Sequence, residues 1–179
     1  MVSRVIPVEP FDLVIFGGTG DLARRKILPA LFRRFCAGQM GPEARVIGAA
    51  RSEMDTQAYR EFARAAILEF DDDTVCAEES LSGFLEQLHY VTLDARGDTG
   101  WDALSGLMVE ERIRAFYFSV GPGLFGDLAE RLHAHGMADA QSRIVVEKPF
   151  GRDLASARAL NQGLAQHFDE TQIYRIDHY

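Results

Sequence analysis

The fold is decided by one stretch near the N-terminus, Phe16-Gly17-Gly18-Thr19-Gly20-Asp21-Leu22-Ala23. It joins a short apolar run to a segment whose apolar residues have helical spacing, and it contains the dinucleotide-binding pattern Gly-x-Gly-x-x-Ala. Glycines permit a tight turn and let backbone N–H groups approach a pyrophosphate, which the start of the following helix also attracts. Because no Gly-Lys-Ser or Gly-Lys-Thr follows, the loop is not of the Walker A type.

Outward from this turn, runs rich in Val, Ile, Phe and Tyr alternate with longer amphipathic stretches, which is typical of βαβ units. The pattern predicts six strands, at residues 12–16, 45–50, 90–93, 114–120, 143–147 and 172–176. It predicts helices at residues 21–36, 56–71, 101–111, 123–136 and 154–168, and a further one ending near residue 88. We expect Pro29 to kink the first helix or start it afresh, and Asp153 to cap the last.

The predicted fold class is α/β: a Rossmann-like, doubly wound, mostly parallel six-stranded sheet with helices on both faces. In such a sheet a ligand binds at the carboxyl ends of the strands. Residues with chemical character follow five of the six predicted strands, which places them together at that edge.

Composition excludes several classes of function. The chain has 179 residues, and 19 basic against 27 acidic side chains give a net charge of −8, which disfavours nucleic acid as a partner. The apolar run at residues 13–16 is far shorter than the roughly 20 residues of a membrane span. Without a signal-peptide pattern, the chain is expected to be cytoplasmic and to have no membrane partner.

The sequence predicts no metal site. Cys36 and Cys76 are two cysteines in apolar, helix-like surroundings, and we expect them to be reduced and structural. Four of the five histidines are expected to lie in helices or at their edges, without acidic partners at ligand spacing. They are His89, His133, His135 and His167.

Arg51 and Ser52 follow the second predicted strand. NAD-specific proteins usually place an acidic residue there to hold the ribose hydroxyls, whereas a guanidinium can form two hydrogen bonds to a 2′-phosphate. Thr19 and Ser52 could add hydroxyl donors. The expected cofactor is therefore NADP, with NAD a weaker possibility.

Three further groups follow later strands. Gly121 and Pro122 come after the fourth strand and are expected to bind the cofactor. Lys148 ends the fifth strand before Pro149, where a cis peptide bond would aim it into the crevice, although a surface turn accounts for Lys-Pro equally well. Asp177, His178 and Tyr179 follow the sixth strand.

Taken together, these motifs resemble the N-terminal coenzyme domain of the glucose-6-phosphate dehydrogenase family over nearly the whole chain. The likeness is carried by residues 17–26, Gly-Gly-Thr-Gly-Asp-Leu-Ala-Arg-Arg-Lys, and by Ala-Arg-Ser at 50–52. It continues in Tyr-Phe-Ser-Val-Gly-Pro at 117–122, Val-Glu-Lys-Pro-Phe-Gly at 146–151 and Tyr-Arg-Ile-Asp-His-Tyr at 174–179.

The resemblance implies a role for each group. Residues 17–23 would bind the coenzyme phosphates, and Arg51 would grip the 2′-phosphate. Lys148 would contact both substrate and the nicotinamide end, beside a cis-proline. His178 and Tyr179 would hold the sugar phosphate, and Asp177 would orient a catalytic histidine that this sequence does not contain.

The family's reaction oxidises glucose 6-phosphate to 6-phosphogluconolactone with NADP, in the oxidative pentose phosphate pathway. The resemblance implies that residues 1–179 form one NAD(P)-binding domain, and that the substrate and dimerisation domain of the family lies outside this chain. We therefore expect this chain to bind coenzyme without turnover, and the full-length protein to form a dimer or tetramer.

The residues fit two other classes of protein less well and leave one alternative function open. No tyrosine has a lysine four positions later, which disfavours the short-chain dehydrogenases and epimerases. A flavodoxin-like signalling domain would need acidic residues where glycines follow the first strand. A non-catalytic NADP-binding sensor module stays open as the alternative.

Overall fold

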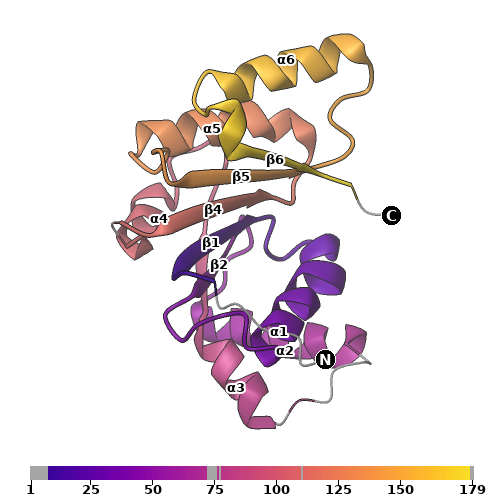
Figure 1. Ribbon diagram of the computed structural model, residues 1–179, viewed down its shortest axis with the longest axis vertical. Coiled ribbons are helices and arrows are strands. Elements are labelled where there is room, and N and C mark those ends of the chain that lie inside the picture. The colour runs from indigo at the N-terminus through magenta and orange to yellow at the C-terminus, as the bar shows by residue number, and fades with distance from the viewer. Residues whose placement is uncertain (1–7, 72–75, 77, 110, 178–179) are drawn as a thin grey trace, which may run out of the picture.

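A computed structural model describes residues 8–71, 76, 78–109 and 111–177. Its centre is a single sheet in the order β3-β2-β1-β4-β5-β6, and all its pairings are parallel (Figure 1). The strands are β1 (Phe11–Phe16), β2 (Arg45–Ala50), β3 (Leu88–Thr92), β4 (Ile113–Phe118), β5 (Ser142–Glu147) and β6 (Ile173–Ile176). The Rossmann-like fold class is thereby confirmed.

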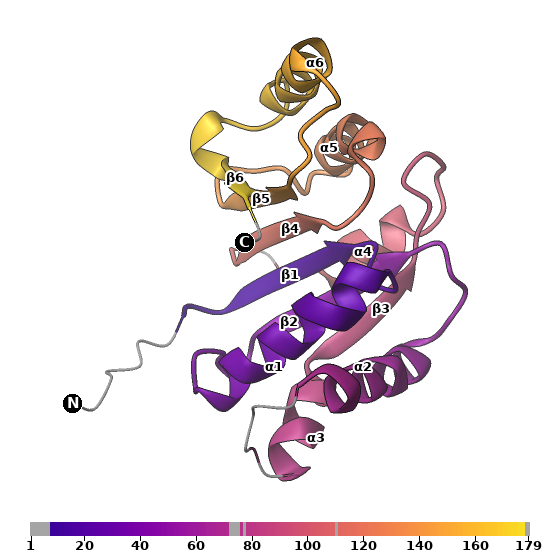
Figure 2. The same cartoon turned by 90° about the vertical axis from the view of Figure 1, so that its right-hand side faces the viewer.

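Helices cover the sheet in two groups, and Figure 2 shows the first group in front of the N-terminal strands. That group consists of η1 (Ala23–Ile27), α1 (Leu28–Cys36), α2 (Thr56–Phe70) and α3 (Glu78–Glu86). The second group consists of α4 (Trp101–Leu107), η2 (Pro122–Leu124), α5 (Phe125–Ala134), α6 (Leu154–Ala165) and η3 (Glu170–Gln172). From β1 the strand order runs outward to β3 on one side and, starting again at β4, to β6 on the other. The point between β1 and β4 is where a doubly wound sheet opens its ligand crevice.

Two hydrophobic cores lie on opposite faces of this sheet. One packs Phe16, Phe116 and Phe118 against Trp101 and the helices of the second group. The other packs alternate residues of β1 and β2 against the first group of helices. Because both faces of β1 are buried, its continuous apolar run fits a central parallel strand.

All six predicted strands exist, with shifts at their ends. The third begins at Leu88 instead of residue 90, and the fourth ends at Phe118 instead of continuing to Val120. At this point the Ser119 N–H donates both to Phe16 O of β1 and to Tyr117 O two residues back, and the second bond turns the backbone out of the strand. Three predicted helices are also shorter, ending at residues 107, 134 and 165.

The first helix starts in a wider π-helical turn, η1, which closes with the Leu28 N–H donating to Ala23 O. Pro29 then stands in the first turn of α1, directly after η1, so the change from π-helical to α-helical hydrogen bonding lies at this proline. The chain is helical on both sides of Pro29, so of the two predicted outcomes a fresh start of the helix is not observed. The Asp153 cap is confirmed, because its carboxylate accepts from the Ser156 N–H at 2.8 Å.

The cysteine prediction was wrong. Cys36, at the end of α1, and Cys76, just before α3, form a disulfide with their Cα atoms 6.4 Å apart. The two are 40 residues apart in sequence, and the packing of α1 beside α3 brings them together.

None of the helices in the described ranges is long and apolar enough to cross a membrane.

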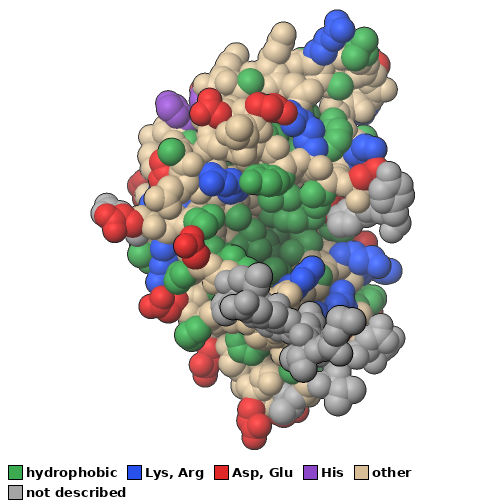
Figure 3. Space-filling view, viewed as in Figure 1, with side chains coloured by type: hydrophobic (Ala, Val, Ile, Leu, Met, Phe, Trp, Pro, Cys, Tyr) green, Lys and Arg blue, Asp and Glu red, His purple; other side chains and the backbone are tan. Residues whose placement is uncertain are grey.

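Figure 3 shows apolar side chains gathered near the middle of one face of the molecule. On β4, β5 and β6, alternate residues such as Tyr117, Val145 and Ile176 are half-buried, and Tyr174 is 50% exposed.

A buried carboxylate secures the amino ends of the central strands. The Asp12 side chain is fully buried and accepts from Arg45 at 2.9 and 3.1 Å and from the Val109 N–H at 3.0 Å. Arg112 lies 3.7 Å away from it. One carboxylate therefore joins β1, β2 and the segment that leads into β4.

Removing this carboxylate leaves the mostly buried Arg45 guanidinium, 22% exposed, without its counterion. We expect Asp12→Ala to lower the free energy of unfolding by about 3 kcal/mol. The matched control is Glu78→Ala, which removes an exposed partner of Arg64 and should cost under about 1 kcal/mol. Urea denaturation measures both, and equal losses would contradict this assignment.

His89 corrects another expectation, because it lies on β3 and not in or beside a helix. Burial lowers the pKa of His89 below its usual 6.5, and the charges of Arg45 and Arg60 lower it further. The folded chain therefore keeps this imidazole neutral at a pH where the unfolded chain protonates it.

Stability should consequently fall as the pH drops through 6.5 toward the lower folded pKa of His89. Histidine titrates between about pH 7 and about pH 5. Over this range we expect the free energy of unfolding of His89→Gln to fall less than that of the parent chain. Urea denaturation across this range measures the difference. Parallel stability profiles would refute the assignment.

Candidate coenzyme site

The turn after β1 is wedged against the neighbouring strands. Gly17 has φ +82°, and a Cβ atom there would lie 2.2 Å from Ser119 O, beyond the end of β4. On the other side, a Cβ atom on Gly18 would lie 2.7 Å from the Gly48 Cα of β2. The N–H groups of Gly17 and Gly18 both donate to Ala49 O. The turn therefore accepts only glycine at these positions.

Tyr59 of α2 supports the same turn from below. Its fully buried hydroxyl donates to Gly18 O at 3.2 Å, and its ring lies over Gly48, where a Cβ atom would be 2.3 Å from the ring. Burial raises the pKa of Tyr59, which keeps the hydroxyl protonated as a donor. The α2 helix thus fixes the height of the turn above β2.

A cavity of about 550 Å³ opens above this turn. The ends of β1, β2, β3 and β4 all contribute to its walls. Among the predicted site residues it contains Gly17, Thr19, Gly20, Arg51, Ser52 and Gly121. Within the described ranges the Thr19 N–H makes no hydrogen bond, so it is available to a phosphate oxygen.

Arg51 carries the positive charge of this cavity on the β2 side. Its exposed side chain makes no hydrogen bond or ion pair with any described residue. The backbone beside it is held in place, because the Tyr90 hydroxyl donates to Ser52 O at 2.7 Å and to Ala50 O at 3.2 Å. An anchored backbone with an uncommitted guanidinium is suited to an anionic ligand.

A second cavity of about 280 Å³ lies on the β5 side of the same strand edge. It brings Leu22 of the glycine turn together with Gly121, Pro122 and Lys148. The Lys148–Pro149 peptide bond is cis, as the sequence suggested. The four predicted residues, from three separate segments, therefore share one space.

Lys148 is already paired in this structure. Its ammonium lies 2.6 Å from Asp177 Oδ2, just after β6, and its side chain is 57% exposed. Asp21 pairs with Arg25 at 2.8 Å, and Ala23 is buried in the core. His178 and Tyr179, predicted to bind the sugar phosphate, lie outside the described residues.

Sequence reasoning missed the wall formed after β3. Leu93, Asp94, Ala95 and Arg96 line the 550 Å³ cavity together with Arg51. These residues form no recognised motif, and their only signal was their position after a parallel strand. The described ranges contain no group of three or more His, Cys, Asp or Glu side chains that could hold a metal ion.

Comparison with known proteins identifies the domain. The family described as glucose-6-phosphate dehydrogenase, NAD binding domain, matches residues 14–179. The chain belongs to this family. The family's description names a dinucleotide, which agrees with the glycine turn and the cavity above it.

Relatives and solved structures give the extent of the match. A glucose-6-phosphate 1-dehydrogenase of Rhizobium meliloti is 49% identical over 181 residues, covering all of this chain and 37% of that protein. One from Gluconobacter oxydans is 47% identical over 176 residues, covering 96% of this chain and 36% of that protein. The chain thus spans just over a third of these glucose-6-phosphate dehydrogenases.

The fold agrees with two glucose-6-phosphate dehydrogenase structures, each 30% identical in sequence. The Mycobacterium avium enzyme matches with a TM-score of 0.85 over 93% of this chain and 36% of its own. A glucose-6-phosphate dehydrogenase in complex with its substrate, glucose 6-phosphate, matches with a TM-score of 0.83 over 100% of this chain and 38% of its own.

The wedged turn can be tested by adding one methyl group. Gly17→Ala should destabilise the chain by about 2 kcal/mol or more, because the backbone is left-handed there and the methyl group meets Ser119 O. Gly126→Ala in α5 is the control, since its Cβ atom meets nothing and helix propensity should add about 0.5–1 kcal/mol of stability. Thermal unfolding measures both, and a neutral Gly17→Ala would contradict the geometry.

Proposed function

We propose that this chain is the coenzyme-binding domain of a glucose-6-phosphate dehydrogenase and that its coenzyme is NADP. The observation that carries the proposal is the Arg51 guanidinium, which has no partner among the described residues and shares one cavity with the glycine turn. A pyrophosphate at the turn places the adenosine ribose toward the end of β2. The 2′-phosphate that distinguishes NADP from NAD then falls within reach of Arg51.

The residues of the cleft fit the successive parts of a dinucleotide. The turn at residues 17–23 offers backbone N–H groups and a helix start to the pyrophosphate. Ser52 offers a hydroxyl beside Arg51. Gly121, Pro122 and Lys148 line the smaller cavity, which suits the nicotinamide end. The two cavities share Val120 and Gly121, so an extended ligand could run from one to the other.

For the whole protein we propose oxidation of glucose 6-phosphate to 6-phosphogluconolactone. NADP, when bound, accepts the hydride that leaves C1 of the sugar, and a base must take the proton of the C1 hydroxyl. From the family resemblance we assign Lys148 to contact substrate, and His178 and Tyr179 to hold its phosphate. By the same resemblance Asp177 would orient the base, a histidine of the family's second domain.

This assignment separates binding from turnover. By the family resemblance the base is a histidine of the second domain, so this chain should bind NADP without oxidising the sugar. We further propose a cytoplasmic location, and a dimer or tetramer for the full-length protein, as the family resemblance implies.

Removal of the Arg51 guanidinium tests the coenzyme. By calorimetric titration, Arg51→Ala should weaken NADP⁺ binding by at least about 1.4 kcal/mol, a factor of ten, and leave NAD⁺ binding nearly unchanged. The control is Arg158→Ala, which removes an exposed guanidinium from α6. Equal weakening of both coenzymes would contradict a 2′-phosphate contact.

Turnover is tested by absorbance of NADPH. The parent chain, given NADP⁺ and glucose 6-phosphate, should form no NADPH although it binds the coenzyme. Formation of NADPH by the purified chain would show that it contains its own base and would overturn the assignment of that role to another domain.

A further inference from the structure

A second guanidinium borders the same cavity as Arg51. Arg96 belongs to the loop between β3 and α4 and lines the same 550 Å³ space. It also lines a neighbouring hollow of about 460 Å³ beside α5, together with Asp127, Glu130 and Arg131. Its side chain therefore stands at the boundary between the coenzyme cleft and this hollow.

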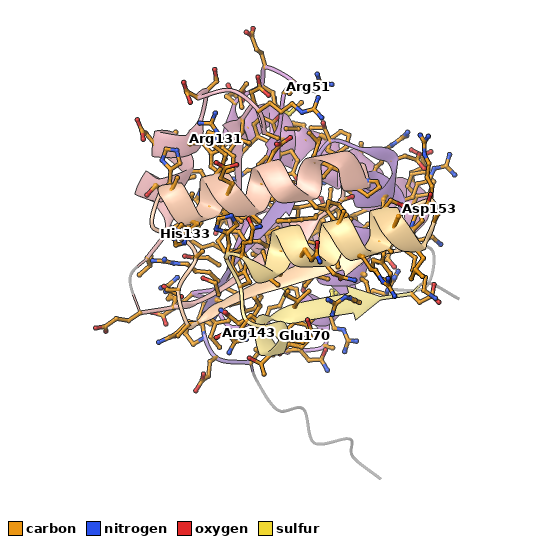
Figure 4. All side chains as sticks on the ribbon, turned by 90° about the horizontal axis from the view of Figure 1, so that it is seen from above. Arg51, Arg131, His133, Arg143, Asp153 and Glu170 are labelled. Carbon is orange, nitrogen blue, oxygen red and sulfur yellow. A yellow bond between two sulfur atoms is a disulfide. The ribbon has the colours of Figure 1, made fainter. Side chains whose placement is uncertain are left out.

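The backbone of the loop is fixed by several hydrogen bonds. The Trp101 indole donates to Asp94 O at 3.0 Å, and the Asp94 N–H donates to Thr99 O at 3.1 Å. Arg131 of α5 donates to Arg96 O at 3.0 Å. Figure 4 shows Arg131 and Arg51 on the same side of α5, away from α6. The position of residue 96 is thus determined before any ligand binds.

The side chain of Arg96 is held much more weakly than its backbone. Its Nε donates to Asp127 Oδ2 at 3.0 Å, and the two side chains are 69% and 42% exposed. An exposed ion pair of this kind contributes little to stability and is readily exchanged for another partner. The guanidinium is therefore free to turn toward the cleft.

The cavity that Arg96 borders has an apolar component. Leu93, Ala95, Leu124 and Leu128 line it, together with the carboxylate-bearing Asp94. With the phosphates at the glycine turn and the ribose at Arg51, the adenine ring is the part of the coenzyme that would reach the end of β3. A flat ring on an apolar wall leaves one face for a planar cation, and guanidinium groups stack well on aromatic faces.

We propose that Arg96 stacks on the adenine ring of the bound coenzyme and leaves Asp127 to do so. This inference rests on the proposed function, because it requires a dinucleotide in the cleft. It makes Arg96 a coenzyme-binding residue that does not distinguish NADP from NAD, since both carry adenine. It also makes Asp127 a competitor, because its carboxylate holds the guanidinium away from the ligand.

Calorimetric titration of the 179-residue chain with NADP⁺ and NAD⁺ tests these roles. Arg96→Ala should weaken both coenzymes by a similar factor of about two to five, leaving their affinity ratio unchanged. Arg96→Lys should fail to restore binding, because an ammonium lacks the stacking plane. Asp127→Asn should tighten both by a factor of about two.

A double variant distinguishes competition from an independent effect. Because Asp127 acts through Arg96, Asp127→Asn should have no effect when Arg96 is already alanine. Arg158→Ala is the matched control for the loss of an exposed arginine. The inference is overturned if Arg96→Ala leaves the affinities for both coenzymes unchanged, or if it lowers the ratio of the NADP⁺ affinity to the NAD⁺ affinity. It is also overturned if Asp127→Asn weakens coenzyme binding.

The same titrations separate failure of this inference from failure of the proposed function. If the parent chain binds NADP⁺, Arg51→Ala weakens that binding and Arg96→Ala binds as tightly as the parent, only the role of Arg96 is refuted. A folded parent, shown by circular dichroism, that binds neither coenzyme refutes both.

Discussion

The rest of the site depends on the close approach of three backbones at the carboxyl edge of the sheet. The turn after β1 passes between the end of β2 and the chain leaving β4, with room for no side chain at Gly17 or Gly18. Tyr59 closes the assembly from the helix side through its hydrogen bond to Gly18 O. The turn is consequently built before a ligand arrives. The N–H groups of Gly17, Gly18 and Gly20 hold its shape through backbone hydrogen bonds, and the Thr19 N–H is left for a ligand among the described residues.

This constraint explains how distant residues come to share one site. Once the turn is seated, the parallel register places the ends of β2 and β3 on one side of it and those of β4 and β5 on the other. Arg51 and Lys148, 97 positions apart by the difference of their numbers, thereby follow β2 and β5 on opposite sides of the turn. The spacing suits a long ligand with phosphates in its middle.

Much of this arrangement could be predicted because it follows from local patterns. Buried strands show as apolar runs, and the glycine turn and Arg51 stand at characteristic positions after β1 and β2. What could not be predicted depends on tertiary contact. The Cys36–Cys76 disulfide joins positions 40 residues apart. The start of β3 was missed because the polar His89 interrupts its apolar pattern. The loop holding Arg96 is defined by Trp101 and Arg131, which no local motif connects to it.

The central claim is that a dinucleotide binds at the carboxyl edge of this sheet, and amide NMR spectra recorded during titration with NADP⁺ test it most directly. The account predicts that the largest shifts fall on residues 17–23, Arg51, Ser52 and 93–96. The opposite edge carries a cavity of about 570 Å³ near Phe35, Gly83 and His89, which serves as an internal comparison. Largest shifts at that edge, or no shifts in a folded sample, would contradict the account.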